Sequence, residues 1–299
     1  MKSKFTGIAS LLLATAIWGS AFVAQSVGME HIGPFTFQAV RCFFAVAGLF
    51  SVILFSDKIK KHNAVQKNSW ADKHLWKAGI LCGIPLFFAC NLQQLGLCDT
   101  DAGKSAFLTA MYIVFVPVLG LLLKRKLPKI IPFSALLAVL GLYFLCCAES
   151  GSMHPGDLML LGCAFMFAVQ ILFVDRFAGS VDPLKLNLIQ SLVCAILSAI
   201  VMLFMETPSW ESIGACLLPL SYAGFLSMGL AYSLQIIGQK HLEPAGASLL
   251  MSLESVFAVL TGWLLLGDLM TLWESIGCVL VFLAVILSQV PDKVSKKVS

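Results

Sequence analysis

The chain alternates between long apolar stretches and short polar connections. Ten of the apolar stretches have the length of a membrane span, at about 5–28, 34–55, 76–97, 103–123, 130–148, 157–174, 184–205, 213–238, 244–266 and 273–290. A helix of about 20 apolar residues crosses a hydrocarbon core of about 30 Å. The pattern therefore predicts an all-α polytopic membrane protein with ten transmembrane helices.

The two halves of this pattern repeat each other. The segment around Arg41 aligns with the segment around Gln190 at a spacing of 149 residues. Ala102–Ser105 aligns with Ala245–Ser248 at a spacing of 143 residues. Each half holds five predicted helices, an odd number, so the second half must enter the membrane from the opposite side.

Inverted repeats of this kind are typical of secondary transporters, whose substrate site lies near the bilayer midplane between the repeats. We therefore expect two five-helix inverted-topology repeats, residues 1–149 and residues 150–299. The interface between them is the expected place for a site.

Charged residues in the connections predict the orientation in the membrane. Basic residues, which are retained on the cytoplasmic side, fall on one set of alternate connections, for example at Lys2, Lys4, Lys58, Lys126, Lys240 and Lys293. The opposite connections carry mainly acids, among them Glu30, Asp101, Glu149, Glu206 and Asp268. This asymmetry predicts that both termini are cytoplasmic. Arg41 and Lys104 break the pattern, and we expect the long side chain of Lys104 to extend to the outer surface.

A single charge, Glu254, lies near the middle of the ninth predicted helix. A carboxylate at the bilayer centre costs roughly 2.5–3.5 kcal/mol, so such a group normally faces a cavity or a partner. At a rise of about 1.5 Å per residue, Arg41 and Glu254 differ in height by only about 5 Å. We expect both side chains to face one central cavity, either paired or separated by substrate. The repeat counterpart of Glu254 is Met111, so the cavity should be electrically asymmetric.

Amide side chains occur in pairs three or four residues apart, a spacing that places both on one helix face. The predicted substrate-binding residues are Trp18, Gln38, Arg41, Asn91, Gln94, Tyr112, Asn187, Gln190, Gln235 and Glu254. The fifth and tenth helices have no amide or charge in their central turns, so they should lie outside the cavity. Three other interpretations stay open: amides that only join neighbouring helices, a structural Arg41–Glu254 pair, and aromatic residues that only pack.

Composition supports the membrane assignment and excludes several classes of function. Of 299 residues, 59% are hydrophobic and 12% are charged, against about 25% charged in soluble domains. The net charge of +4 lies outside the apolar stretches, so we expect no nucleic-acid partner. Most of the ten cysteines sit inside apolar stretches, where they act as small hydrophobic residues.

Motifs for enzymatic chemistry are missing from the predicted spans. The five histidines lie at helix ends or in connections, so no His-Glu-x-x-His zinc site can form on a span. Gly103-Lys104-Ser105 imitates the end of a phosphate-binding loop, but Cys98 stands where that motif requires glycine. We expect no catalytic residues, no metal and no cofactor.

Four stretches together resemble the EamA type of the drug/metabolite transporter superfamily, with two EamA repeats. They are Ala16–Ser20, Ala39–Phe43, Ala102–Thr109 with Pro117, and Ser252–Phe257. The resemblance implies a central cavity built from helices one to four and six to nine, and alternating-access transport of small metabolites. The family usually has proline after the ninth-helix glutamate. This chain has Ser255, so the helix should be straighter there or bend differently.

These observations favour a secondary transporter of small organic, amino-acid-like solutes, with export as the expected direction. The alternatives are a non-transporting membrane scaffold or sensor and a channel-like facilitator. The expected location is the cytoplasmic membrane, and the expected partners are the lipid bilayer and a small-molecule substrate, with the protein a monomer or a homodimer. Glu254 is either a proton carrier or a permanent counter-charge to Arg41.

Overall fold

Every regular element in the described part of the chain is a helix. The computed structural model describes residues 2–60, 69–100, 102–125, 127–146, 154–266 and 271–289. In chain order the elements are α1 (Lys2–Met29), α2 (Pro34–Lys60), α3 (Lys73–Asp99), α4 (Ala102–Thr109), α5 (Tyr112–Leu122), α6 (Ile130–Cys146), α7 (Pro155–Ala178), α8 (Pro183–Met205), α9 (Trp210–Ala215), α10 (Leu217–Ser221), η1 (Tyr222–Ala231), α11 (Tyr232–Gln239), α12 (Pro244–Met251), α13 (Leu253–Leu266) and α14 (Leu272–Ser288). The all-α class is confirmed for these residues.

Eight helical stretches are long and apolar enough to cross a membrane. They are Ser3–Met29, Pro34–Asp57, Lys73–Asp99, Ala102–Leu122, Pro155–Ala178, Pro183–Met205, Leu217–Gln239 and Pro244–Leu264. The helices α6 and α14 are apolar but have only 17 residues each. These ten stretches overlap the ten predicted ranges, and length with composition establishes eight of them as candidate spans.

Two of the predicted helices are interrupted at related positions. Between α4 and α5 the backbone tightens, and the N–H of Met111 bonds to the carbonyl of Leu108 at 3.2 Å. Between α12 and α13 the N–H of Ser255 bonds to the carbonyl of Ser252 at 3.2 Å. Bonds to the residue three positions back are the 3₁₀ pattern, which often marks a hinge. In the aligned repeats Ser252 corresponds to Thr109, the last residue of α4, so both helices break at nearly the same place.

The break before α13 forms without a proline. Ser255, at the position where proline is usual, instead donates its hydroxyl to the carbonyl of Ala106 in α4 at 3.0 Å. The helix is therefore interrupted at Ser252 although the proline is missing. Neither break holds glycine or proline, which explains why the sequence pattern shows two continuous helices.

The predicted eighth helix contains a π-helix, η1, ten residues long. A π-helix bonds each N–H five residues back and is rare, and it occurs mostly at functional sites. Gly224 lets η1 approach α2 closely, because a Cβ there would lie 2.5 Å from Cβ of Phe44 and 2.8 Å from the carbonyl of Arg41. The π-helix therefore forms a wall directly beside Arg41.

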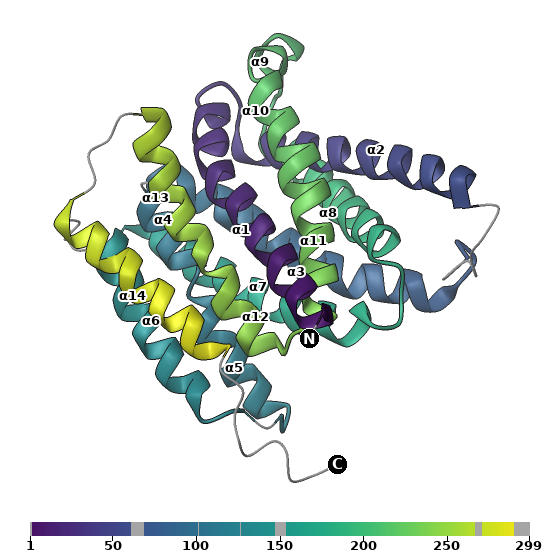
Figure 1. The fold of residues 1–299 in the computed structure, drawn as a ribbon. Coiled ribbons are helices and arrows are strands. Elements are labelled where there is room, and N and C mark those ends of the chain that lie inside the picture. Colours follow the sequence, from purple (N-terminus) through teal and green to yellow (C-terminus); the bar gives the residue numbers. More distant parts are fainter. Residues whose placement is uncertain are drawn as a thin grey trace.

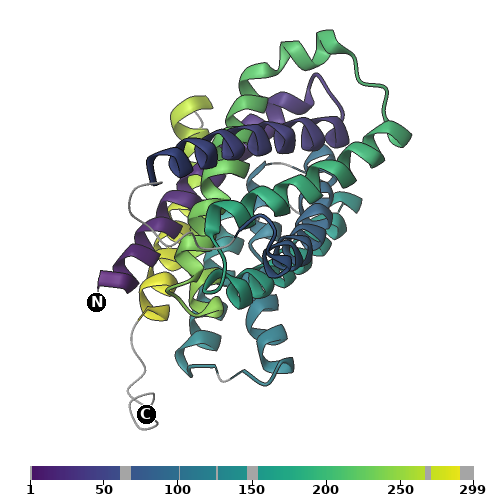
Figure 2. The same ribbon diagram turned by 90° about the vertical axis from the view of Figure 1, so that its right-hand side faces the viewer.

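The main helix–helix contacts join the first half of the chain to the second. Helix α3 packs against α7 and α8, α2 against α8 and η1, α1 against α13 and α11, and α6 against α14. Figure 1 shows α6 and α14 side by side at one edge of the molecule, as expected for the fifth and tenth helices. Figure 2 shows α2 and α8 as long helices on the side opposite to that edge. The remaining helices surround the centre.

Two charged contacts bear on the predicted orientation. The expectation for Lys104 is wrong: its side chain is only 10% exposed and pairs with Asp157 at 2.7 Å instead of reaching the surface. The start of α1 and the end of α14 lie at the same end of the molecule, because Lys4 donates to the carbonyl of Gln289 at 2.9 Å. Of the charges behind the orientation, Asp101, Lys126, Glu149, Asp268 and Lys293 lie outside the described residues.

Candidate functional site

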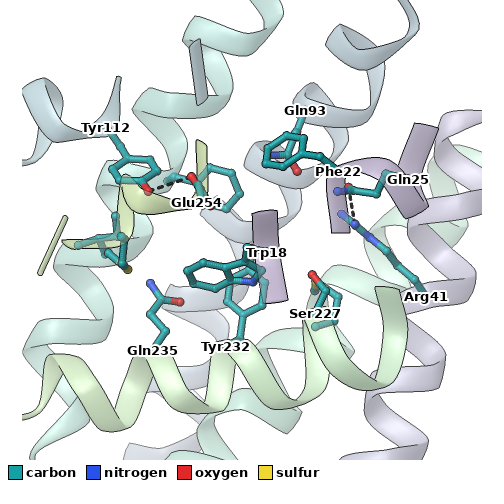
Figure 3. Close-up of a pocket in the computed structure, with 14 residues that line it drawn as sticks. Trp18, Phe22, Gln25, Arg41, Gln93, Tyr112, Ser227, Tyr232, Gln235 and Glu254 are labelled. Carbon is teal, nitrogen blue, oxygen red and sulfur yellow. Dashed lines mark hydrogen bonds between the residues drawn. The ribbon is translucent and has the colours of Figure 1, made fainter. Parts of the chain in front are cut away.

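A cavity lies between the two halves of the chain. It encloses about 500 Å³ of space not filled by atoms, including its opening. Helix α1 contributes residues from three consecutive turns of one face, and every other lining element adds one or two residues. The lining residues are Trp18, Phe22, Gln25, Arg41, Gln93, Tyr112, Phe167, Ile171, Ser227, Met228, Tyr232, Gln235, Met251 and Glu254. Figure 3 shows ten of them with their labels.

Arg41 forms the cationic part of the cavity wall. It is 2% exposed, and its Nε donates to Oε1 of Gln38 at 2.7 Å while Nη1 donates to Oε1 of Gln25 at 2.6 Å. The guanidinium also lies 5.7 Å from the ring centre of Phe37. A guanidinium has five N–H donors, so these two bonds leave donors that can serve a bound anion.

Glu254 forms the anionic part of the wall. It follows the break before α13 by two residues and is 5% exposed. Its Oε1 accepts a hydrogen bond from the hydroxyl of Tyr112 at 2.9 Å, which comes from the first residue of α5. The two broken helices thus meet at the cavity, and their breaks carry the two partners of this bond.

The opposite charges do not pair with each other. Within the described part of the chain, ion pairs join Lys104 to Asp157 and Arg125 to Asp175, and neither Arg41 nor Glu254 takes part in one. Figure 3 shows Arg41 and Glu254 on opposite sides of Trp18. A buried charge without a counter-ion is costly, so an occupant that satisfies both groups would relieve the cost at both ends.

Aromatic rings line the space between the two charges. Trp18 of α1 and Tyr232 of α11 meet edge to face, with ring centres 5.0 Å apart. Tyr112 and Phe167 meet edge to face at 6.5 Å. The arrangement suits a solute with an apolar body and charged or polar ends.

Five of the predicted binding residues line this cavity: Trp18, Arg41, Tyr112, Gln235 and Glu254. The other five are buried, lie outside the cavity lining and bond to neighbouring helices; they are Gln38, Asn91, Gln94, Asn187 and Gln190. Asn91 donates to Ser198 at 2.8 Å, and Gln94 donates to the sulfur of Met29 at 3.0 Å.

Several lining residues were missed by the sequence interpretation. Phe22 and Gln25 could have been found, because they share one face of α1 with Trp18 at spacings of four and seven residues. Ser227 could not, because it shares a face with Tyr232 only through the five-residue spacing of the π-helix.

The described residues offer no group of three or more His, Cys, Asp or Glu side chains that could hold a metal ion. The cavity residues include a cation, a carboxylate, amides and aromatic rings. Such a set can bind a polar organic solute by charge, hydrogen bonds and ring contacts.

Comparisons with known proteins assign the chain to a family. The profile of the EamA-like transporter family matches it twice, at residues 5–147 and 154–289. A protein of Archaeoglobus fulgidus named "Uncharacterized transporter" is 30% identical over 278 residues, covering 93% of this chain and 83% of the relative. The Bacillus subtilis "Uncharacterized transporter YoaV" is 23% identical over 277 residues, covering 91% of this chain and 92% of that protein.

A solved crystal structure supports the same fold. It superposes with a TM-score of 0.77 at 18% identity, covering 100% of this chain and 99% of the other. The two family matches together span nearly all of the sequence, and their boundary falls between α6 and α7. The chain belongs to the EamA-like transporter family.

Proposed function

We propose that the protein is a secondary transporter that moves small organic metabolites across the cytoplasmic membrane by alternating access, with export as its direction. One observation carries this proposal. Arg41 and Glu254 come from opposite halves of the chain and line one cavity without pairing. Two halves that each hold one charge can separate on either side of a bound solute.

The proposed substrates are amino-acid-like solutes. A carboxylate would bind the free donors of Arg41, because charged hydrogen bonds of this kind are strong and directional. An ammonium group would bind Glu254, and an apolar side chain would lie against Trp18 and Tyr232. The five residues outside the cavity lining would hold these side chains in position.

The proposed topology has ten spans in two inverted repeats, residues 1–149 and 150–299, with both termini in the cytoplasm. Two observations support it. An even number of spans places the two ends of the chain on one side, in agreement with the contact between Lys4 and Gln289 at 2.9 Å. The breaks after Thr109 and at Ser252 occupy nearly equivalent repeat positions.

The transport proposal is tested with purified protein in liposomes. We expect uptake of radiolabelled amino acids that rises when unlabelled solute is present on the far side, since exchange of this kind requires alternating access. Arg41→Gln and Glu254→Gln should each lower uptake at least tenfold. The matched controls are Arg176→Gln and Glu211→Gln, which alter exposed residues. Uptake without stimulation from the far side would indicate a channel-like facilitator, and no uptake by folded protein would contradict transport of these solutes.

The same liposomes test whether Glu254 carries a proton. If it does, an imposed pH gradient drives accumulation by the wild type, and Glu254→Gln retains only exchange. Wild-type accumulation that is indifferent to the gradient would leave Glu254 as a fixed countercharge and would contradict proton coupling.

A further inference from the structure

A chain of four buried amides runs from the π-helix to the cavity. Asn187 of α8 donates through Nδ2 to the carbonyls of Met228 at 3.0 Å and Gly229 at 2.8 Å. Its Oδ1 accepts from Nε2 of Gln190 at 2.9 Å. The Oε1 of Gln190 accepts from Gln170 at 3.3 Å, and the Oε1 of Gln170 accepts from Gln235 at 3.1 Å. Three helices and the π-helix are joined in one line.

The donor-to-acceptor direction of these hydrogen bonds is fixed at the first amide, Asn187. Backbone carbonyls can only accept hydrogen bonds, so Asn187 must turn its NH₂ group toward Met228 and Gly229. Each following amide must then present its NH₂ group to the oxygen before it. Reversing any one of them would place oxygen against oxygen or nitrogen against nitrogen. The orientation of every amide, which cannot otherwise be assumed for such side chains, follows from the two carbonyls.

The chain therefore ends on an acceptor. Because Nε2 of Gln235 is bound to Gln170, its Oε1 must face the other way. Gln235 lines the cavity and is 2% exposed, and its Oε1 has no hydrogen-bond partner within the described residues. A buried polar atom without a partner is unfavourable, so this oxygen favours an occupant that brings a donor.

The acceptor lines the same cavity as the two charged side chains. Figure 3 shows Gln235 below Trp18, Glu254 and Tyr112 above it, and Arg41 and Gln25 to the right. The Nε1 of Trp18, which can only donate, also lacks a partner among the described residues. The wall thus offers oxygen acceptors from Glu254 and Gln235, and N–H donors from Arg41 and Trp18.

We propose that Gln235 is a specificity-determining residue whose fixed oxygen selects solutes that carry an N–H or O–H donor for it. This inference rests on the proposed transport function. It adds a second, uncharged acceptor to the cavity besides the carboxylate, so that a solute with only one donor leaves one oxygen unpaired. Solutes with an amino group that has several N–H bonds, or with an amino group and a hydroxyl, fit best.

The test uses pairs of solutes in which methylation of one member removes N–H or O–H donors. They are L-phenylalanine with its N,N-dimethyl derivative, L-tyrosine with O-methyl-L-tyrosine, and L-tryptophan with 1-methyl-L-tryptophan. Binding to detergent-solubilised protein is measured by thermal shift for the wild type and for Gln235→Met, which keeps the side-chain length. The control is Gln239→Met, because Gln239 is equally buried in the same helix but bonds to the carbonyl of Ile171 at 3.1 Å and lies outside the cavity lining.

The wild type should bind the donor-bearing member of at least one pair about tenfold more tightly or better, as expected when a buried acceptor would otherwise remain unpaired. In Gln235→Met this preference should fall below threefold, while Gln239→Met keeps it. Gln170→Met should lower the preference as well, because it frees Gln235 to turn. A preference unchanged in Gln235→Met, or lost equally in Gln239→Met, overturns the proposal.

Two further outcomes separate this proposal from the transport function. Wild-type protein that transports these solutes but shows no preference within any pair overturns the role of Gln235 alone. Folded wild type that neither binds nor transports any of them contradicts both proposals. If Gln235→Met does not fold, Gln170→Met decides: it frees Gln235 to turn, so the preference should fall, and a preference that stays unchanged there overturns the proposal.

Discussion

The ion pair between Lys104 and Asp157 should be a main stabilising contact between the halves of the chain. The two side chains are 10% and 2% exposed, and their charged atoms lie 2.7 Å apart. Removing one partner of a buried pair leaves an uncompensated charge and costs about 3–5 kcal/mol. Asp157 keeps bonds from Thr100 at 3.2 Å and from the N–H of His154 at 2.9 Å, so we place Lys104→Met near the lower value, about 3 kcal/mol.

The measurement is a double-mutant cycle. Detergent-solubilised protein is unfolded by titration with SDS and followed by circular dichroism, for Lys104→Met, Asp157→Asn and the double variant. A buried pair replaced by neutral groups is often tolerated, so the double variant should lie within about 1 kcal/mol of the wild type. The coupling energy should exceed about 1.5 kcal/mol. Single variants that cost under about 1 kcal/mol, or costs that simply add, would refute a buried stabilising pair.

Three further substitutions test the packing around the cavity by the same unfolding assay. Gly19→Ala should cost about 1–3 kcal/mol through overpacking, because its Cβ would lie 2.6 Å from the Glu254 carbonyl. The control is Gly103→Ala, whose Cβ would have nothing within 4 Å. Equal costs for the two variants would contradict the close approach at Gly19. Glu206→Gln should cost about 2 kcal/mol, because the carboxylate accepts hydrogen bonds from two backbone N–H groups at the start of α2, at 2.9 and 2.8 Å. An unchanged midpoint of SDS unfolding would argue against this capping of α2 by Glu206. Ser255→Ala should cost about 1 kcal/mol by removing a 3.0 Å bond to α4, and a stabilised variant would show that the bond is not formed.

The sequence alone predicted the helical fold class and the residues whose charged side chains are costly to place in a membrane. Arg41 and Glu254 stand out because charge is rare inside apolar stretches. Counting residues along each predicted helix placed the two at similar depths in the membrane. Lys104 was misjudged, since its counter-ion Asp157 is 53 residues away in the chain and no local pattern links the two.

Local patterns also failed where helices depart from regular geometry. The breaks beside Met111 and Ser252 contain no glycine or proline, and the π-helix has no sequence signature that a period of 3.6 residues would reveal. Amide spacing gave the correct faces for Asn187 and Gln190. It could not tell a residue that lines a cavity from one that supports it from behind, because both lie on the inner side of the bundle.

The helices of one half of the chain pack mainly against helices of the other half, and this affects the stability of each half on its own. Helix α2 lies mainly against α8 and η1, α3 against α7 and α8, and α6 against α14. A fragment ending before α7 would lose the surfaces that bury its most polar helices, and would leave Arg41 and Lys104 without their surroundings in the lipid. We therefore expect each half to behave as one subunit of a dimer, whose covalent link to the other half supplies the partner at a fixed one-to-one ratio. Two fragments made together from separate genes should find each other and rebuild the cavity, whereas neither should persist alone.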